Sequence, residues 1–385
     1  MVKGKKLLIL LSIIIPLFGC SNSRSGGHDN PPEPPEPPVR EHFIEATSPS
    51  DEGLLSLAGD DVTDFVENYT FALSDNYVRD YNHYEAKESI TLTWTIKETA
   101  NYYLVELSSD EDLTDSSIYL TNEESVEISG LLPAMQYYWR VNAYFDTKIV
   151  RSYTFTFETR ALPQAIYLET IGNLRSLGGM VTIDNKRIKD GMVYRGANAD
   201  SASYNDRRYM TNTLGIKTEI DLRNDGEGLR NVLGVENCVS IDANGGLYYD
   251  VSPNGISTST GKQALVRELR YFADINNYPI YFHCAIGRDR TGSLACVLLS
   301  LLGVSKKDMC IDYEMSMFAA VSTSDIRSGL CTALDLVNQL FTIYNYIYGG
   351  FTGANMKEKT ENFLLDIGMT QAEIDAIRNN LLEDR

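Results

Sequence analysis

The sequence predicts a multidomain chain with two folded parts, an all-β sandwich over residues 51–160 and an α/β domain over residues 163–385. In the first part, short runs of alternating apolar and polar side chains are separated by polar turns, which is typical of β-sandwiches. In the second part, strand-like runs alternate with long helical patterns, which favours a mostly parallel sheet flanked by helices. Residues 283–292 form a loop motif that lies directly between an apolar run and a buried helical pattern.

Residues 1–20 have the pattern of a bacterial secretory signal. Three lysines precede an apolar run over 7–15, and a Leu-Phe-Gly-Cys sequence then ends at Cys20. This ending resembles the cleavage box of lipoproteins, in which the cysteine becomes the acylated first residue. The run is too short for a comfortable membrane span. We therefore expect a lipid on Cys20 that anchors the protein in the bacterial cell envelope, in the periplasm or at the outer membrane.

Residues 21–50 are expected to form a linker. They are rich in Gly, Ser and Asn, and then repeat Pro-Pro-Glu over residues 31–38. Repeated proline favours extended conformations, so this segment is predicted to be a semi-stiff spacer between the membrane and the folded parts.

Charge is distributed unevenly along the chain. The first 160 residues carry 26 acidic and 12 basic side chains, a net charge of −14 out of −19 for the whole sequence. A strongly acidic first half argues against a nucleic-acid partner and indicates a solvated surface.

The segment 51–160 resembles a fibronectin type III domain. The likeness rests on Trp94 in an early strand, on the Gly-Leu-Leu-Pro turn at 130–133 and on the Tyr-Trp-Arg-Val run at 138–141. The resemblance implies a sandwich that buries the early tryptophan against a later tyrosine. It also implies a spacer, or a module that docks protein or glycan, without catalysis. The strand candidates are 90–94, 102–107, 125–128, 137–143 and 153–159.

The segment 163–385 is predicted to contain four strands and several helices. The final helix opens with Thr370 and Glu373 in the spacing of a capping box. Gly303 is expected to end the helix that follows the loop motif. The strand candidates are 192–195, 218–222, 238–241 and 278–282, and the helix candidates are 260–276, 291–302, 327–348 and 370–383.

The loop motif has the features of a phosphate site with a cysteine nucleophile. Unpaired N–H groups at a helix N-terminus attract anions, and Arg290 adds a planar fork that matches two phosphate oxygens. Cys284 would lie under the phosphorus as a thiolate favoured by the helix end, which predicts a cysteinyl-phosphate intermediate. The six N–H groups expected to ring the phosphate belong to Ala285, Ile286, Gly287, Arg288, Asp289 and Arg290.

Residues 165–385 resemble the atypical bacterial tyrosine phosphatases whose loop reads His-Cys-x-x-Gly-Lys-Asp-Arg-Thr-Gly. The resemblance implies the fold of other cysteine phosphatases and a phosphorylated substrate: phosphotyrosine, phosphoserine/threonine or a phosphoinositide. Neither a cofactor nor a metal is expected, because Arg290 and the helix end supply the positive charge. At position 288 this sequence has arginine where the family has lysine. Arg288 either affects substrate preference or is an exposed charge at the rim of the site. The matching blocks besides the loop are 173–179, 191–196, 214–223 and 367–370.

The general acid is expected within the loop itself. Many cysteine phosphatases carry it on a Trp-Pro-Asp loop, but Trp94 and Trp139 both lie in the sandwich segment. Asp289 resembles the family's candidate acid and would then activate water for the second step. Its alternative is a structural carboxylate paired with Arg288 or a backbone N–H. Asp242, in the loop after the strand at 238–241, is the second candidate acid.

Four further residues are expected to support the site. Thr291 would donate its hydroxyl to the Cys284 sulfur, or cap the helix. His283 would orient the loop and favour the thiolate, or be an ordinary core histidine. Asp221 and Arg223 match a family block beside the active site. They would either support the site or form an ordinary salt bridge.

The leading functional hypothesis is a cysteine-dependent phosphomonoesterase that acts on phosphoprotein, above all on phosphotyrosine. Its rival within the enzymes is a phosphoinositide or inositol-phosphate phosphatase. A hypothesis of a different class is a surface protein whose inactive phosphatase domain binds phosphorylated ligands. The presence of Cys284, Asp289 and Arg290 together argues against this last one.

Overall fold

The computed structural model of this chain describes ten segments: residues 44–71, 89–114, 116–129, 131–161, 164–166, 168, 170–223, 231–241, 255–318 and 333–385. All of them belong to one compact unit, residues 42–385. The expected signal with Cys20, nearly all of the expected linker and the candidate acid Asp242 lie outside the described residues. None of the helices in the described segments is long and apolar enough to cross a membrane.

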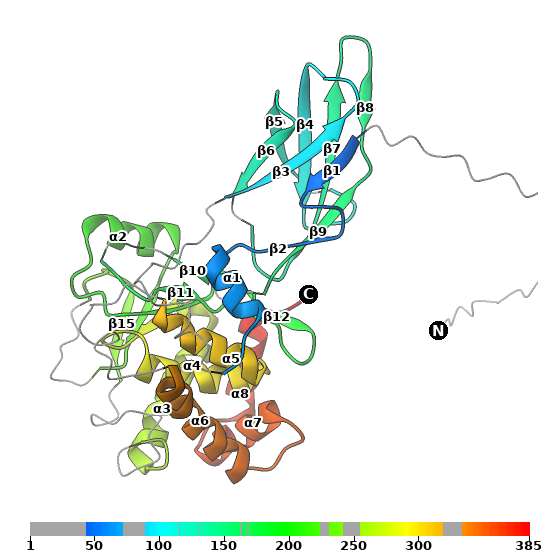
Figure 1. Cartoon of the computed structure of the whole chain (residues 1–385). Helices are drawn as coiled ribbons and strands as arrows, with labels where there is room; N and C mark the ends of the chain where they lie inside the picture. Colours follow the sequence, from blue (N-terminus) through cyan, green and yellow to red (C-terminus); the bar gives the residue numbers. More distant parts are fainter. Residues whose placement is uncertain are drawn as a thin grey trace, which may run out of the picture. The chain divides into compact units, whose positions relative to one another are not determined.

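Residues 44–159 form two β-sheets that share one apolar core (Figure 1). The smaller, antiparallel sheet has the strand order β1 (Ile44–Ser48), β3 (Ser89–Ile96), β6 (Ser125–Ser129). The larger sheet has the order β2 (Gly53–Leu55), β9 (Phe155–Thr159), β7 (Gln136–Tyr144), β4 (Tyr102–Ser108), β5 (Ser117–Thr121), with β8 (Ile149–Arg151) beside β7. Only β2 and β9 pair in parallel there.

The core between these sheets is built by side chains that alternate along the strands. On β4, every second side chain is buried, beginning with Tyr103, because successive residues of a strand point to opposite faces. Trp94 on β3 meets Tyr103 with ring centroids 5.3 Å apart and Trp139 on β7 at 6.3 Å. The tyrosine that covers the early tryptophan therefore comes from the next strand of the chain.

The first residues of this region differ from the sequence prediction in two ways. Strand β1 begins at Ile44, inside the expected linker, because it pairs with β3. Residues Asp60–Glu67 form helix α1, within the segment that was expected to be an all-β sandwich. Val62 and Phe65 have the i, i+3 spacing of one helical face, and Tyr69 follows the end of the helix. All three side chains are buried in the core of the α/β part, not in the core between the two sheets.

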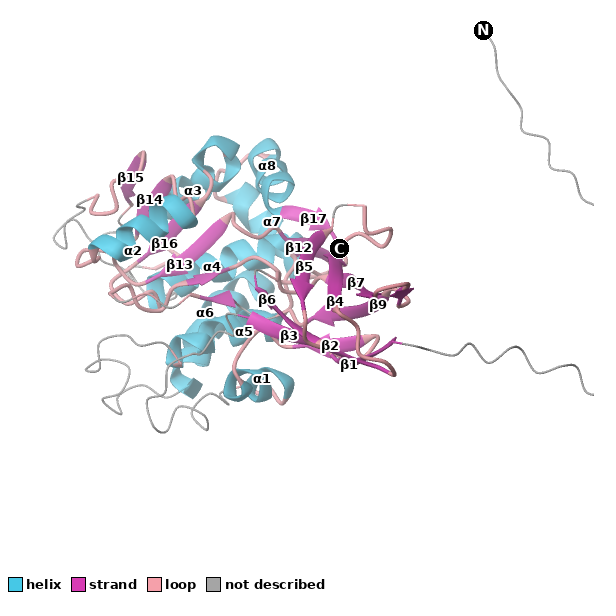
Figure 2. Ribbon diagram, turned by 90° about the horizontal axis from the view of Figure 1, so that it is seen from above, coloured by secondary structure: helices cyan, strands magenta, loops and turns pink. Residues whose placement is uncertain are grey.

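The α/β part is organised around one six-stranded sheet (Figure 2). Its central strands run parallel, as predicted, and two short strands continue it antiparallel at one edge. The strand order is β10 (Gln164–Ala165), β11 (Arg175–Ser176), β13 (Val193–Gly196), β16 (Ile280–His283), β14 (Thr218–Asp221), β15 (Asn237–Ser240).

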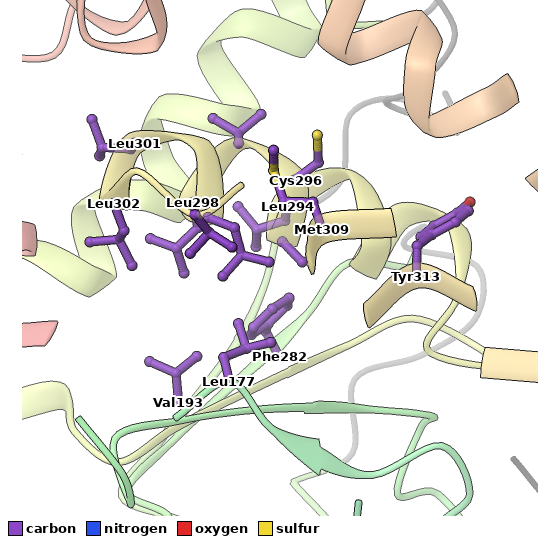
Figure 3. Close-up of a cluster of buried hydrophobic side chains, with 14 of the residues drawn as sticks. Leu177, Val193, Phe282, Leu294, Cys296, Leu298, Leu301, Leu302, Met309 and Tyr313 are labelled. Carbon is purple, nitrogen blue, oxygen red and sulfur yellow. The ribbon is translucent and has the colours of Figure 1, made fainter. Parts of the chain in front are cut away.

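The two faces of this sheet are covered by different elements. On β16, Ile280 and Phe282 point into a large apolar cluster formed with several helices, whereas Tyr281 points into a smaller cluster that includes Tyr194 of β13 and Met210. Figure 3 shows Phe282 of the large cluster beneath Leu294 and Leu298. The remaining elements are α2 (Tyr204–Arg208) with a π-turn (Tyr209–Thr213), α3 (Ser259–Ala273), α4 (Asp289–Leu302), α5 (Lys306–Glu314), α6 (Ala333–Gly350), α7 (Met356–Asp366), α8 (Gln371–Leu381) and single 3₁₀ turns at Ile275–Asn277 and Met315–Met317.

The helix ends follow local sequence signals. Helix α4 ends at Gly303, whose φ of 87° lies in the left-handed region, as predicted. Helix α8 opens with the predicted capping box of Thr370 and Glu373. It ends two residues earlier than predicted, because Leu382–Asp384 forms β17 against β12 (Lys186–Ile188). Residues 327–332 of the helix predicted over 327–348 lie outside the described residues, and the rest belongs to α6.

Candidate active site

The loop motif lies at the carboxyl end of the central parallel strand. Strand β16 ends at His283, which is in register with Gly196 of β13 and with Asp221 of β14. The loop then runs through Cys284, which is 2% exposed, and Asp289 opens α4. Ligands of open α/β sheets bind at this end of the strands, so the topology places the loop where a binding site is expected.

Three neighbouring residues hold the carbonyl groups of the loop. Asn198 donates from its backbone N–H and from Nδ2 to the Ala285 oxygen, at 3.1 and 2.8 Å. Asn173 Nδ2 donates to the Ile286 oxygen at 2.9 Å. Arg195 Nη2 donates to the Gly287 oxygen at 2.9 Å. All three carbonyl groups are thus bound on the side of the loop that faces the end of β13 and the segment before β11.

The orientation of the carbonyls fixes the orientation of the amides. In a planar trans peptide the N–H points opposite to the preceding C=O. The N–H groups of Ile286, Gly287 and Arg288 are therefore turned to the other side of the loop. Those of Ile286 and Gly287 donate to no residue that the structure describes. A tetrahedral anion at this helix N-terminus would meet several such donors at once.

Gly287 is required by the close approach of the loop to β13. Its φ is +70°, which favours glycine. A Cβ atom there would also lie 2.2 Å from the carbonyl carbon and oxygen of Gly196. The glycine at the third position of the loop therefore has a backbone reason and a packing reason.

A buried ion cluster fixes the residues that hold the loop. Asp312 on α5 accepts from Arg175 Nε at 2.7 Å and from Arg195 Nη1 at 2.5 Å. All three side chains are at most 2% exposed. Burial opposes the charge of Asp312, but Arg175 and Arg195 outweigh it and hold the pKa of this carboxyl below its usual value. Neither this cluster nor the two asparagines were expected from the sequence, although a charged residue within an apolar strand pattern, as at Arg195, is a usable signal.

His283 connects the loop to strand β14. Its Nε2 lies 2.9 Å from Glu219 Oε1, and its Nδ1 lies 3.2 Å from the carbonyl oxygen of Cys284. The ring is fully buried and stacks on Tyr281 with centroids 5.2 Å apart. The histidine thus contacts the loop backbone, and Glu219, which the sequence analysis missed, fixes its far side.

Asp289 is bound by two other side chains. Arg288 Nε and Nη2 donate to its two carboxylate oxygens at 2.9 and 3.1 Å. The Tyr313 hydroxyl, from α5, donates to Oδ1 at 3.2 Å. Pairing of Asp289 with Arg288 was the alternative to the acid role. The side chain of Arg288 is only 11% exposed, so the alternative of an exposed rim charge does not hold for it.

Arg290 and Thr291 begin α4 directly behind the loop. Arg290 Nη1 donates to the Leu222 carbonyl at 3.4 Å. Thr291 is fully buried, and its Oγ1 has no hydrogen-bond partner among the described residues. The predicted hydrogen bond from Thr291 to the Cys284 sulfur is therefore not formed in this structure. Thr291 does not cap the helix either, because it lies inside α4.

Asp221 and Arg223 form an ion cluster with Asp200 at the end of β14. Arg223 binds Asp221 through Nε and Nη2, the latter at 2.7 Å, and Asp200 through Nη1 at 2.6 Å. Burial works against the charge of Arg223, but the two carboxylates outweigh it and raise the pKa of its guanidinium. The cluster adjoins the site, because Asp221 is in register with His283.

The other described thiols are poor nucleophiles. Burial raises the pKa of Cys238, Cys296 and Cys310 to about 12 in each case. In the part of the chain that the structure describes, no group of three or more His, Cys, Asp or Glu side chains is arranged to hold a metal ion.

Comparison with known proteins gives a family match over the α/β part. The profile of a family described as "Tyrosine phosphatase family" matches residues 166–383. A Cupriavidus necator protein named as a tyrosine-protein phosphatase is 28% identical over 165 residues, which cover 38% of this chain. The matched region spans 60% of the length of that relative.

Two solved structures are also similar in part. The core catalytic domain of the PP-IP phosphatase SIW14 from S. cerevisiae, solved with citrate, has 16% identity and a TM-score of 0.28, covering 48% of this chain and 98% of that chain. A second structure of the Siw14 catalytic core has 16% identity and a TM-score of 0.26, covering 41% of this chain and 86% of that chain.

Proposed function

Because this chain belongs to the tyrosine phosphatase family, we propose that it hydrolyses phosphate monoesters through a cysteinyl-phosphate intermediate on Cys284. One observation carries the proposal: Asn173, Asn198 and Arg195 bind the loop carbonyls from one side and so turn the loop amides to the other. Such preorganised donors stabilise charge that develops on phosphate oxygens in the transition state, without reorganisation at the moment of reaction.

The reaction has two balanced steps. In the first, the Cys284 thiolate attacks phosphorus in line, the S–P bond forms, and the bond from phosphorus to the leaving oxygen breaks. Arg290 and the loop amides hold the three non-bridging oxygens, while Asp289 gives its proton to the leaving alcohol. In the second step, Asp289 takes a proton from water. The water oxygen bonds to phosphorus, the S–P bond breaks, and inorganic phosphate and the thiolate result.

Asp289 must exchange partners for this role, since Arg288 now binds both of its oxygens. An incoming phosphate is a stronger attraction for a guanidinium than a single carboxylate, because it offers more negative charge. Arg288 is therefore expected to turn from Asp289 to the substrate.

Replacing Asp289 by Asn tests the acid role. The amide cannot supply a proton, so we expect kcat on alkyl phosphates to fall by about 10²–10⁴-fold. An aryl phosphate with a good leaving group, such as p-nitrophenyl phosphate, should be affected much less. The measurement is kcat for both classes over a range of leaving-group pKa. Equal slowing of both classes would assign the acid to another residue, and Asp242→Asn is the next variant to measure.

We propose a protein phosphotyrosine as the substrate class. Near the loop, Arg288 is expected to turn to the reacting phosphate, whereas the guanidinium of Arg223 is neutralised by Asp221 and Asp200. The site therefore has enough positive charge for one phosphate. An inositol polyphosphate carries several phosphates and would need further cations to bind them. Inositol phosphates are the second candidate substrate class, because Arg288 adds a basic side chain to the loop itself.

Phosphate release by the full chain decides between these classes. The substrates are phosphotyrosine and phosphoserine peptides, a phosphoinositide series and inositol hexakisphosphate, with Cys284→Ser as the control. Cysteine-dependent release led by phosphotyrosine peptides supports the proposal, and release led by inositol lipids or inositol phosphates replaces it with the second candidate. No release by a folded protein would leave a phosphoryl-binding surface protein as the function to pursue.

We also propose that the protein is a lipid-anchored component of the cell envelope and that residues 44–159 act as a fibronectin type III-like spacer or docking module. The pattern of residues 1–20 supports the anchor, and the two sheets with the buried Trp94 support the module. Mass spectrometry of the mature N-terminus tests the anchor, because an unmodified Cys20, or a chain that still begins before it, contradicts lipidation.

A further inference from the structure

Tyr313 is placed to control the orientation of Asp289. Its ring comes from α5, and its hydroxyl donates to Asp289 Oδ1 at 3.2 Å. The side chain is almost fully buried, at 2% exposure for the residue. Figure 3 shows the ring at the margin of the large apolar cluster, with its hydroxyl oxygen directed away from the cluster.

The position of the ring is set by the first turn of α4. A Cβ atom on Gly292 would lie 2.1 and 2.5 Å from Cε2 and Cδ2 of Tyr313. The aromatic ring therefore fills the space that a side chain at this position would take. Because residue 292 is a glycine, the Tyr313 ring can lie against the backbone of α4. From there its hydroxyl reaches the carboxylate of Asp289, one turn earlier on the same helix.

The backbone next to Tyr313 is fixed to the sheet. The carboxylate of Asp312 binds Arg175 and Arg195, and its carbonyl oxygen accepts from Arg175 Nη2 at 2.7 Å. Arg195 also holds the Gly287 carbonyl of the loop. One buried cluster thus sets the position of the loop and of the turn of α5 that carries the tyrosine.

The two partners of Asp289 differ in how they are attached. Arg288 is its neighbour on the same loop, and by the proposed mechanism it turns to the substrate when phosphate enters. Tyr313 belongs to a different element, α5, whose backbone beside the tyrosine is held by Arg175. After Arg288 has turned, the tyrosine is the partner that holds Asp289 at a fixed distance from α5.

From this geometry we infer that Tyr313 is a positioning residue, which keeps the Asp289 carboxyl directed at the leaving oxygen and later at the attacking water. The inference rests on the proposed phosphatase function and deepens it. Tyr313 does not contact the phosphate in this account, so its hydroxyl should affect proton transfer and not phosphate binding.

The test is Tyr313→Phe, which removes only the hydroxyl and keeps the ring against Gly292. We expect kcat on an alkyl phosphate to fall about 10-fold, as for the loss of one hydrogen bond to a charged group. The rate on p-nitrophenyl phosphate should change by less than about 2-fold, because that leaving group needs little protonation. KM and the affinity for orthovanadate should stay as in the wild type. In the Asp289→Asn background, Tyr313→Phe should have no further effect.

Tyr278→Phe is the matched control. Tyr278 is also buried and donates its hydroxyl to a backbone carbonyl, that of Phe272 at 2.6 Å, but it lies before β16, at the end opposite the loop. It reports what the loss of a buried tyrosine hydroxyl costs in stability without contact to Asp289. A comparable thermal shift in the two variants, with a leaving-group effect in Tyr313→Phe alone, supports the inference.

Other outcomes overturn it. Unchanged kinetics in Tyr313→Phe, equal slowing of alkyl and aryl substrates, or effects additive with Asp289→Asn would each make Tyr313 a purely structural residue. In those cases the wild type still hydrolyses phosphate esters in a Cys284-dependent manner, and the proposed function stands. A folded wild type without such turnover would refute the proposed function and this inference together.

Discussion

Replacing Cys284 by Ser is expected to abolish phosphate release while leaving the fold intact. The hydroxyl is nearly isosteric with the thiol, and the side chain is buried at the end of β16, so little packing is lost. A serine hydroxyl is a much weaker nucleophile than a thiolate, and Asp289 enters the first step as the acid, so it does not activate the hydroxyl. We expect kcat to fall by at least about 10⁴-fold, to the background of the assay. The measurement is phosphate release at saturating substrate, together with a thermal melt.

Two observations make this test specific. The other described thiols have pKa values raised by burial to about 12, so none of them can readily replace Cys284. The loop amides and Arg290 are unchanged by the substitution, so the variant should still bind orthovanadate or phosphate. A Cys284→Ser variant with the wild-type rate would refute the cysteinyl-phosphate mechanism. If the variant is inactive because it does not fold, the loop is tested instead by measuring the affinity of the wild type for phosphate.

Replacing Asp312 by Asn is expected to have the largest effect on stability. The substitution leaves the guanidinium groups of Arg175 and Arg195, which are 1% and 0% exposed, without the carboxylate that neutralises both. Removing one partner of a buried ion pair typically costs about 3–5 kcal/mol in free energy of unfolding. Activity should fall as well, because Arg195 also holds the Gly287 carbonyl. The measurement is the midpoint of urea unfolding.

Asp384→Asn provides the matched control. Asp384 pairs with Lys186, and the two side chains are 92% and 45% exposed, so this loss should cost at most about 1 kcal/mol. Equal shifts of the two variants would contradict a central role for the buried cluster.

The same cluster predicts a pH dependence of stability. The pKa of Asp312 is lower in the folded than in the unfolded chain, so its stabilising contribution is complete above the unfolded value of about 3.9. The contribution is lost as the pH falls below that value through the folded pKa. Asp312→Asn should therefore lose less stability than the wild type between pH 5 and the acid transition.

The sequence predicts what is encoded by neighbouring residues. The apolar run before Cys284, the loop and the helix that ends at Gly303 are contiguous, so periodicity and motif together identify them. The parallel central sheet follows from strands that alternate with helices. The capping box of α8 needs only Thr370 and Glu373, three residues apart.

The sequence does not reveal contacts between distant segments. Arg175, Arg195 and Asp312 come from two strands and a helix, and only the tertiary fold brings them together. The partnership of Tyr313 with Asp289 has the same origin. Helix α1 was missed because its apolar face has no partner in the region around it and finds one in the α/β part.

Helix α1 has a consequence for how the α/β part can be divided or transferred. The family match begins at residue 166, yet Phe65 fills the core of that part and meets Phe318 with ring centroids 5.1 Å apart. Tyr69 donates to Glu314 at 2.6 Å, one residue after Tyr313. A polypeptide that starts at the family boundary would thus lack part of its own interior. Recombination at that boundary would separate the α/β part from a helix that completes its core.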